Sequence, residues 1–511
     1  MFWRRRILVA ALALGLVAAL VVGGGYAYVQ WRFHQIRREK VAGLAPIKAI
    51  PGRGGAAGVT ADKAPFNILL VGDNCRDCLD GTQTGAFGSA SDVGGGRSDV
   101  TMLLHVDPAT DHVAILSIPR DLWLPIPDST SQIRVDAALN NGPGALVTTI
   151  EDALDIPINH YVELNFDTFQ RVVDALGGVN MYFPTRLFDS YSGLNVVPGC
   201  FHLDGTQALQ VVRARHTYYQ QNNTWLYDGL GDISRIQRDH EFLKVLAAAV
   251  TAQGLGNPIV DNNLISAVVK DITIDSAFTL SELSQLAQIF SHVDVATAPQ
   301  TTLPVDEDNS ASGFVYKNVQ YGDVVFPAQA EDRAAIQQFL GETTGAESAS
   351  TPALPVTVVN GSGIDGKATA VASQLRALGV TVAATSTGHV DSTPAESVVY
   401  YAPGNEASAQ TLANKLGGAV ALGQNKALAG NGLTLIVGTN LTVAASPATS
   451  PASTAASSSA PAATPPAATP IGGLTAANPS YPAFDPTACP AGASAQKLPS
   501  IPAPSSRELP S

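Results

Sequence analysis

The sequence predicts an α/β protein in which a mixed central sheet is flanked by helices, with a smaller α/β domain behind it. Two observations support the first domain: a nearly continuous apolar run at Phe66–Val71, typical of a strand buried on both faces, and apolar residues at helical spacing after Asp167. The second domain is indicated by strands and helices that alternate from residue 354 to about 443. A chain of 511 residues has room for both.

Residues 1–29 are predicted to hold a cytoplasmic start and one transmembrane helix. Ile7–Val29 is an uncharged apolar run that follows Arg4–Arg6 and is long enough to cross a bilayer. A cleaved signal peptide has a shorter apolar region and a small-residue cleavage site, so the run favours an uncleaved anchor. Basic residues on the two sides balance and do not set the orientation. Residues 30–65 carry Pro and Gly without an apolar period and are predicted to be a linker.

The first domain is expected to span residues 66–345. A tight turn at Asp107–Thr110 between two apolar runs predicts a hairpin after the first strand. A helix is expected to start at Asp167, with Phe169, Val172, Val173 and Leu176 on one face, and to end at Gly177. We expect this stripe to pack in the core. Further helices are predicted at about 233–252, 262–270 and 279–291.

Residues 346–353 are expected to be a linker, 354–443 the second domain, and 444–511 a disordered tail. The tail consists mostly of Ala, Pro, Ser and Thr, which bury too little apolar surface to offset the chain entropy. Inside the second domain, Gly361–Lys367 fits the spacing of a nucleotide phosphate loop. Ala368 stands where that loop needs a hydroxyl, so we expect a tight turn and no nucleotide.

The net charge of −13 argues against nucleic acid as a partner. Four cysteines are present, and in an oxidising compartment we expect disulfides among Cys75, Cys78, Cys200 and Cys489. Three pairings are possible, and the sequence does not choose among them.

The stretch Leu203–Lys244 gathers four arginines, at positions 213, 215, 235 and 238, in an otherwise acidic chain. Arginine presents a planar fork of donors that matches phosphate oxygens, so the cluster suggests a phosphate or pyrophosphate clamp. The alternative is an ordinary surface helix in which Arg235 and Arg238 pair with nearby carboxylates. His216 beside the arginines is more easily explained by a structural role than by catalysis.

The order of residues in this stretch, LDGTQAL, then Arg-x-Arg, then Asp-x-x-Arg-x-x-Arg, resembles the LytR-CpsA-Psr (LCP) family. Three upstream segments resemble its other motifs in order: NILLVGDNCR, GGRSDVTMLLHVD and ILSIPRDLWLPIP. Residues 354–443 resemble the LytR C-terminal domain. The resemblance implies the LCP fold and an enzyme that moves a glycopolymer from a polyprenyl-pyrophosphate carrier to the muramic acid 6-hydroxyl of peptidoglycan. In the family, apolar helices near the sheet enclose the polyprenyl tail.

The resemblance also implies the site. Asp73 and Asp99 would hold Mg²⁺ or Mn²⁺, with Asp99 the safer ligand, because many relatives place the first acid one residue later. The pyrophosphate would be held by Arg120, Arg213, Arg215, Arg235 and Asp239, and Asp99, Arg120 and Arg235 would be catalytic. Asp239 departs from the glutamine usual in the family: it can pair with an arginine, bind metal or point away. Arg238 is expected to serve helix packing or a surface pair.

We therefore expect a single-pass membrane protein with a cytoplasmic N-terminus and an extracytoplasmic glycopolymer phosphotransferase domain. A composition biased toward Ala, Val and Gly, with 20 Arg to 10 Lys, suggests a genome of high GC content. Such a genome would favour ligation of arabinogalactan in an actinobacterial wall. The alternative is a non-catalytic binder that presents lipid-linked glycan to a partner enzyme. All expected phosphate-handling residues precede residue 240, so the second domain is expected to be dispensable for the chemical step.

Overall fold

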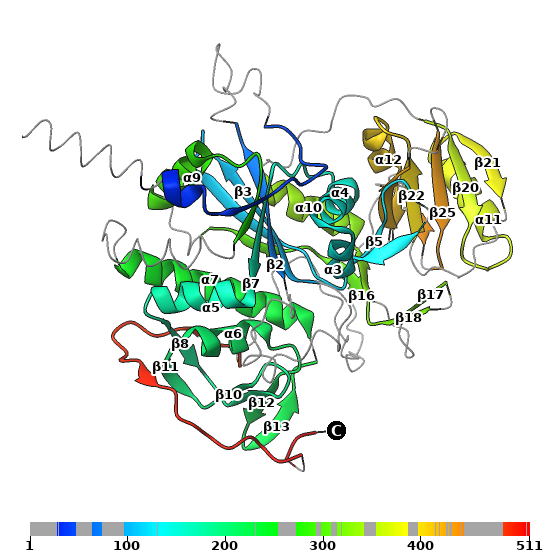
Figure 1. Cartoon of the computed structure of the whole chain (residues 1–511). Coiled ribbons are helices and arrows are strands. Elements are labelled where there is room, and N and C mark those ends of the chain that lie inside the picture. The colour runs from blue at the N-terminus through cyan, green and yellow to red at the C-terminus, as the bar shows by residue number, and fades with distance from the viewer. Residues whose placement is uncertain are drawn as a thin grey trace, which may run out of the picture. The chain divides into compact units, whose positions relative to one another are not determined.

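The computed structural model describes most of the chain between residues 28 and 510 (Figure 1). The described residues are 28, 30–47, 64–73, 97–129, 131–229, 231–253, 272–292, 298–307, 314–317, 319–341, 354–386, 397–413, 415–417, 420–425, 428, 432–439, 441–443, 484–506 and 508–510. They form two compact units. Unit 1 comprises residues 1–113, 158–298 and 482–511, and unit 2 comprises residues 114–157 and 299–481.

Unit 1 contains the mixed sheet that the sequence predicts, with its strands in the order β1-β14-β7-β2-β3. The strands β1 and β14 are parallel, as are β7 and β2, whereas β14 runs antiparallel to β7 and β2 runs antiparallel to β3. The bounds are β1 (Arg37–Glu39), β2 (Phe66–Asp73), β3 (Ser98–Asp107), β7 (His160–Asn165) and β14 (Thr273–Asp275). The apolar run at Phe66–Val71 lies inside β2, and the chain turns after β3 where Thr110 N donates to Asp107 O. The α/β class with a mixed sheet is confirmed.

Helices of unit 1 follow the predicted order but differ at their starts. The helices are α5 (Phe166–Ala175), α6 (Gly205–Arg213), α7 (Asp232–Gln253) and α9 (Leu280–His292). Helix α5 begins before Asp167, because Asn165 is its N-cap and accepts a hydrogen bond from Thr168 N. In the predicted apolar stripe, Val173 and Leu176 are buried. The helix predicted at 262–270 lies outside the described residues.

A second layer of strands lies beside α5, α6 and α7 (Figure 1). One sheet has the order β27-β8-β11-β28 and a second has the order β10-β9-β12-β13. Between these strands and helices lies an apolar core that includes Val173, Leu203 and Phe242. The bounds are β8 (Val179–Phe183), β9 (Leu187–Asp189), β10 (Leu194–Val196), β11 (Gly199–Leu203), β12 (Tyr218–Gln221), β13 (Thr224–Tyr227), β27 (Thr487–Ala488) and β28 (Gln496–Lys497).

The prediction that residues 444–511 form a disordered tail is wrong for the part that contains β27 and β28. Strand β27 pairs with β8 and β28 pairs with β11, so the tail adds a strand to each side of one sheet. Cys489 forms a disulfide with Cys200, and the Phe484 ring stacks on Tyr219 with 4.0 Å between ring centroids. Composition failed as a guide because a covalent bond, backbone pairing and one aromatic contact hold this segment. Residues 444–483 lie outside the described part.

Unit 2 contains the residues after β3 and the second domain. Its first part pairs β15 (Gln300–Thr302) in parallel with β4 (His112–Ser117) and also contains β5 (Trp123–Pro125), β6 (Gln132–Arg134), α3 (Val135–Ala138), α4 (Pro143–Leu154), β16 (Val305–Glu307), β17 (Phe314–Tyr316), β18 (Val319–Gly322), β19 (Val325–Pro327) and α10 (Gln329–Phe339). An aromatic cluster around the fully buried Trp123 includes Phe314 and Tyr316.

The second domain has the predicted alternation of strands and helices. Its sheet has the order β21-β20-β25-β22-β24. The elements are β20 (Val356–Asn360), α11 (Lys367–Ala377), β21 (Val382–Ser386), β22 (Ser397–Tyr401), α12 (Glu406–Ala413), β23 (Leu416–Gly417), β24 (Val420–Gln424), β25 (Leu433–Val437) and β26 (Thr442–Val443). Two hydrogen bonds stabilise the turn at Gly361–Lys367. Ser362 N donates to Asn360 Oδ1, and Lys367 Nζ donates to Thr439 O.

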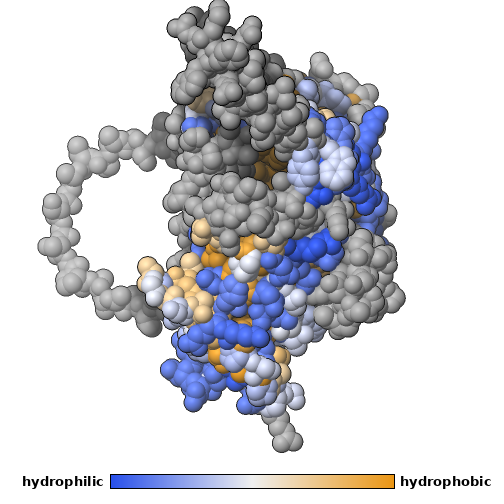
Figure 2. All heavy atoms as spheres, turned by 60° about the vertical axis from the view of Figure 1, so that its left-hand side comes forward, coloured by the Kyte–Doolittle hydropathy of each residue, from blue (hydrophilic) through white to orange (hydrophobic). Residues whose placement is uncertain are grey.

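Two sequence predictions concern parts that the structure does not describe. No helix among the described residues is long and apolar enough to span a membrane, and the predicted span Ile7–Val29 lies almost entirely outside those residues. Cys75 and Cys78 also lie outside them. On the face drawn in Figure 2, hydrophobic residues lie among hydrophilic ones.

Gly205, the glycine of the LDG segment, is the first residue of α6 and lies against the backbone of α5. A Cβ at this position would lie 2.3 Å from the Gln170 carbonyl oxygen, and Gly205 N donates to Asp174 Oδ1. The sequence indicated a turn here, but the requirement for glycine is steric.

We predict that Gly205→Ala lowers the free energy of unfolding by about 1–3 kcal/mol, because backbone atoms must move to admit the methyl group. Gly432→Ala is the matched control, since its added methyl would meet only the Pro355 carbonyl oxygen, at 3.4 Å. Chemical denaturation of both variants measures the difference. Equal stability of the two would contradict the steric explanation.

Candidate functional site: an arginine cluster at the strand ends

Asp73 and Asp99 lie next to each other at the end of β2 and the start of β3. Gly72 pairs with Val100 and Asp73 pairs with Ser98, so the register shifts by one residue at Asp99. Among the described residues no group of three or more His, Cys, Asp or Glu side chains could hold a metal. Mg²⁺ is commonly bound by one or two carboxylates together with substrate phosphates, and this pair of carboxylates fits that pattern.

Arg213 is the last residue of α6, and Arg215 comes two residues later. The helix starts with a capping box in which Asp204 and Gln207 each bond the other's backbone, and it ends at Arg213. The Arg213 guanidinium lies over the Phe166 ring, 4.5 Å from its centroid. After the helix, Arg215 N and His216 N both donate to Asp189 Oδ2, at 2.8 and 2.9 Å. The backbone that carries the arginines is therefore fixed at several points.

The first turns of α7 bring Arg235 to the same place. Asp232 Oδ1 lies 2.7 Å from Arg235 Nη2 and 3.4 Å from Arg215 Nε, so one carboxylate holds both arginines. Arg235 Nε lies 3.9 Å from Asp239 Oδ2. The surface-helix alternative predicted such pairs, but Arg235 is only 3% exposed. These are buried pairs, and the helix face that carries them is not a solvated surface.

Asp239 is the residue that departs from the family pattern, and it lies in the protein interior. Neither of its carboxylate oxygens accepts a hydrogen bond from the described residues. Burial raises the pKa of Asp239 to about 8, against the opposing effect of Arg235, and the charges of Asp232 and Asp99 raise it further. Arg235 is thus the arginine nearest to Asp239 among the ion pairs of the described residues, at 3.9 Å and without a hydrogen bond, and a role of Asp239 in binding metal or pyrophosphate stays a prediction.

Arg120 belongs to unit 2, where it joins a cluster of two arginines and two aspartates. Its Nη2 lies 3.4 Å from Asp136 Oδ2 and its Nε lies 3.5 Å from Asp121 Oδ1. Arg134 donates twice to Asp136, at 2.7 and 3.0 Å, and its Nη1 lies 3.4 Å from Asp121 Oδ1. Asp136 has no exposed side-chain surface and its backbone N donates to Arg120 O. Arg120 is thus held in place from its backbone and its side chain.

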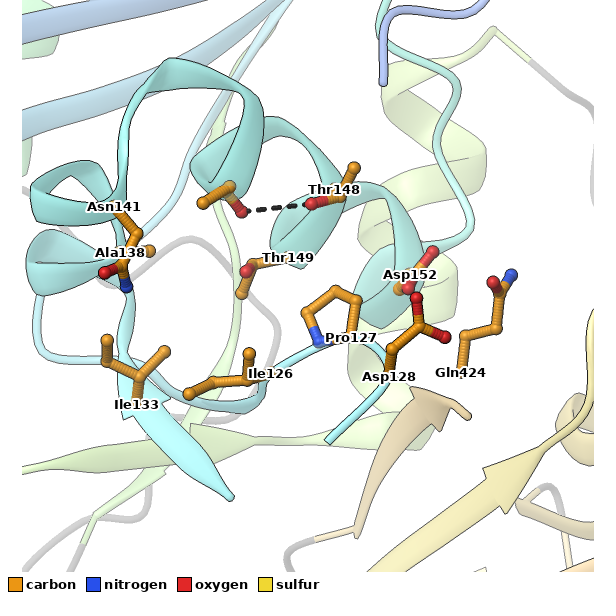
Figure 3. Close-up of a pocket in the computed structure, with 11 residues that line it drawn as sticks. Ile126, Pro127, Asp128, Ile133, Ala138, Asn141, Thr148, Thr149, Asp152 and Gln424 are labelled. Atoms are coloured by element: carbon orange, nitrogen blue, oxygen red, sulfur yellow. Dashed lines mark hydrogen bonds between the residues drawn. The ribbon is translucent and has the colours of Figure 1, made fainter. Parts of the chain in front are cut away.

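Unit 2 also has a pocket of about 280 Å³ between α4, the β5–β6 segment and the end of β24 (Figure 3). Ile126 and Pro127 form part of its wall, and Asp128 and Asp152 add two carboxylates near Gln424. None of the predicted phosphate-binding residues lines it. Two carboxylates without a lining cation disfavour an anion, so this pocket is not a second phosphate site.

Sequence reasoning expected carboxylates close in the sequence to pair with Arg235 and Arg238, but it missed the other carboxylates that hold the arginines. Asp189 has no local signal, because it lies in β9, far from Arg215 in the sequence. Arg134 and Asp136 flank Val135 at the junction of β6 and α3, and this charged pair beside a predicted catalytic segment is the signal that could have found them. Arg238, expected to serve helix packing or a surface pair, is fully buried, which excludes the surface pair.

The part of the chain that carries these residues matches a known protein family. The model described as the LytR_cpsA_psr family matches residues 37–326, more than half of the chain, and the chain belongs to this family. A second model, described as LytR cell envelope-related transcriptional attenuator, matches residues 353–440.

Individual relatives are cell wall proteins. LcpB of Corynebacterium glutamicum, a probable cell wall biosynthesis protein, is 34% identical over 229 residues, which are 44% of this chain and 52% of LcpB. The chain thus matches about half the length of that relative. LcpA of the same organism, a cell wall biosynthesis protein, is 26% identical over 440 residues, 79% of this chain and 81% of LcpA. TagU of Bacillus cereus, a polyisoprenyl-teichoic acid–peptidoglycan teichoic acid transferase, is 29% identical over 45% of this chain and 67% of TagU.

Among solved structures, a LytR-Csp2A-Psr enzyme from Actinomyces oris is 24% identical. It aligns with 59% of this chain and 96% of its own, with a TM-score of 0.44.

We predict that Asp136→Ala destabilises the protein by about 3–5 kcal/mol, because it leaves Arg134 and Arg120 buried without their shared carboxylate. Asp167→Ala removes a carboxylate from a half-exposed pair with Arg171 and should cost about 0–1 kcal/mol. Urea denaturation of the two variants measures the contrast. A loss below 1 kcal/mol at Asp136 would show that the cluster does not stabilise unit 2.

Asp239 gives a prediction about pH. With its pKa raised to about 8, the folded protein keeps a proton that the unfolded chain loses near its ordinary value of 3.8, so stability falls as pH rises between those values. Asp239→Asn removes this ionisation. The variant should therefore gain stability over the natural protein between pH 5 and pH 8, by on the order of a few kcal/mol.

Denaturant melts in a chelating buffer measure this difference, and the exposed Asp111→Asn is the control for losing a surface carboxylate. A stability difference that stays constant with pH would show that Asp239 is ionised throughout this range.

Proposed function

We propose that this protein is a glycopolymer phosphotransferase that joins a polyprenyl-pyrophosphate-linked glycan to the muramic acid 6-hydroxyl of peptidoglycan. The observation that supports this most is that the single carboxylate of Asp232 holds both Arg215 and Arg235, while Arg213 lies two residues before Arg215 at the end of α6. Three fixed guanidinium groups make a site for an anion with several oxygens, as a pyrophosphate is. Membership of the LCP family and the printed activity of TagU support the same reaction class.

In this reaction the 6-hydroxyl oxygen attacks the phosphorus next to the sugar as the hydroxyl loses its proton. The bond from that phosphorus to the bridging oxygen breaks, the glycan is left in a phosphodiester, and polyprenyl phosphate departs. Little covalent chemistry falls to the protein, so its part is to position the phosphates and to stabilise charge on their oxygens. Arginines held by buried carboxylates suit this role, because they need not reorganise during the reaction.

Asp73 and Asp99 are the residues that would hold a divalent ion in this proposal. Mg²⁺ or Mn²⁺ there would supply further positive charge to the phosphate oxygens. The neighbouring register positions of the two carboxylates support this assignment, with Asp99 as the principal ligand.

Further proposals concern the polymer that is transferred, the lipid that carries it and the membrane topology of the protein. The composition supports arabinogalactan as the polymer, and the Corynebacterium glutamicum relatives are described as cell wall biosynthesis proteins. Apolar residues on α5 and α7 would border the polyprenyl chain, as the resemblance to the family implies. The apolar run Ile7–Val29 would anchor the protein with its N-terminus in the cytoplasm and the residues after the run outside. Mass spectrometry of lipid that copurifies with the protein identifies the carrier and its glycan.

We predict that Asp99→Ala and Arg120→Ala each lower the rate of glycan transfer about 10²–10³-fold, because each removes charge stabilisation that grows as the phosphoryl bond breaks. Arg120→Lys should also be slow, since an ammonium group cannot replace the bidentate fork. Asp99→Ala should in addition lose its response to added Mg²⁺. The assay follows cleavage of the pyrophosphate bond in a lipid-linked substrate, with folding checked by thermal melting.

Arg171→Ala, a half-exposed arginine on α5, is the matched control and should keep natural activity. Folded Asp99→Ala and Arg120→Ala proteins that turn over at the natural rate would refute the catalytic assignment. If they bind substrate normally and the natural protein releases no polyprenyl phosphate, the protein is a binder that presents glycan to a partner enzyme.

A further inference from the structure

Arg238 lies on α7 one turn beyond Arg235, and it has no exposed side-chain surface. Its Nη2 donates to the carbonyl oxygen of Ala214 at 2.6 Å, and its Nη1 donates to Asp485 Oδ1 at 2.7 Å. Asp228 Oδ2 lies 3.7 Å from the same Nη1. The guanidinium therefore connects α7 with the segment after α6, with Asp228 before α7, and with Asp485, which lies 247 residues further along the chain.

Each of these contacts concerns the candidate site. Ala214 is the residue between Arg213 and Arg215, so its carbonyl belongs to the backbone that sets the spacing of these two arginines. Asp228 Oδ1 accepts a hydrogen bond from Ser234, the residue before Arg235. Arg238 is thus hydrogen-bonded to the backbone of one half of the arginine cluster while its own helix carries the other half.

Asp485 reaches Arg238 from the end of the chain, 247 residues away. Its segment is held independently of the ion pair, by the Cys200–Cys489 disulfide, by strands β27 and β28, and by the stacking of Phe484 on Tyr219. Further along, Arg186 and Asn195 donate to the carbonyls of Pro502 and Ile501. The carboxylate is therefore delivered to a fixed position in unit 1.

We propose that Asp485 and Arg238 are positioning residues: the carboxylate from the C-terminal segment orients Arg238, which fixes the Ala214 carbonyl and through it the spacing of Arg213 and Arg215 for binding pyrophosphate. This rests on the function proposed above. It makes the last residues of the chain part of the anion site, although they contribute no group that touches the anion.

The energetics favour positioning over simple stabilisation. A fully buried ion pair is an expensive way to stabilise a fold, because desolvation of both charges offsets their attraction, and apolar residues of the same size often serve as well. Burial raises the pKa of Asp485 to about 6, against the effect of Arg238. A pair that costs this much and also bonds the backbone between two site arginines is best explained by the geometry it imposes.

The test compares Asp485→Asn with Glu508→Gln in the full-length protein. Both substitutions remove one carboxylate from the C-terminal segment, but Glu508 is exposed and bonds only its neighbour Ser505. Calorimetry measures the affinity for inorganic pyrophosphate, and amide hydrogen exchange measures protection of Arg215 and His216. Asp485→Asn should raise the pyrophosphate Kd about tenfold, the effect of one charged hydrogen bond, and should speed exchange at these two amides. Strand β2 should keep its protection, and Glu508→Gln should behave as the natural protein.

The other possible results also decide whether Asp485 and Arg238 position the site arginines. Natural affinity and natural exchange in folded Asp485→Asn would overturn the proposal, as would exchange that rises equally in β2, which reports general destabilisation. If the natural protein does not bind pyrophosphate, the proposed function fails, while the exchange measurement still decides the positioning role. If Asp485→Asn does not fold, Arg238→Lys takes its place: an ammonium group cannot serve both Ala214 and Asp485, so the same local loss is expected, and its absence would overturn the proposal.

Discussion

The structure around the candidate site depends on the need to neutralise buried arginines. Arg235 and Arg238 leave water almost completely, and a buried guanidinium is costly unless a carboxylate pairs with it. In unit 1, Asp232 pairs with Arg235, and Asp228 and Asp485 pair with Arg238. In unit 2, Asp121 and Asp136 pair with Arg120 and Arg134. The carboxylates decide where each arginine can lie, and hence which shape of anion the cluster can accept.

Local features of the fold could be predicted from the sequence because each rests on a few neighbouring residues. The apolar run in β2, the capping box of Asp204 and Gln207, and the alternation of strands and helices after residue 354 are of this kind. The ordered end of the chain could not be predicted. Its strands are short, and its position depends on Cys200, Tyr182 and Phe201, which lie hundreds of residues earlier in the chain.

The difference between local features and contacts between distant residues also applies to the candidate site. Family motifs identified the arginines, and the structure joins Arg215 and Arg235 through the carboxylate of Asp232, which belongs to the Asp-x-x-Arg motif. The motifs did not identify Asp189 or Asp485, because these two carboxylates lie far in the sequence from the residues that they contact. Arg238 illustrates this limit of sequence reasoning. Its spacing from Arg235 suggested a minor role, and only its hydrogen bonds to Ala214 and Asp485 show that it is a buried residue with partners in distant parts of the chain.

The path of the chain changes what can be concluded about the second domain. The chain leaves unit 1, forms the domain of residues 354–443, and returns to unit 1 with Asp485 and Cys489. A truncation near residue 345 therefore removes two things at once, the second domain and the partner of Arg238. Loss of activity after such a truncation would not implicate the second domain. An internal deletion of residues 354–443 that keeps the end of the chain separates the two contributions, because it leaves the carboxylate that holds Arg238.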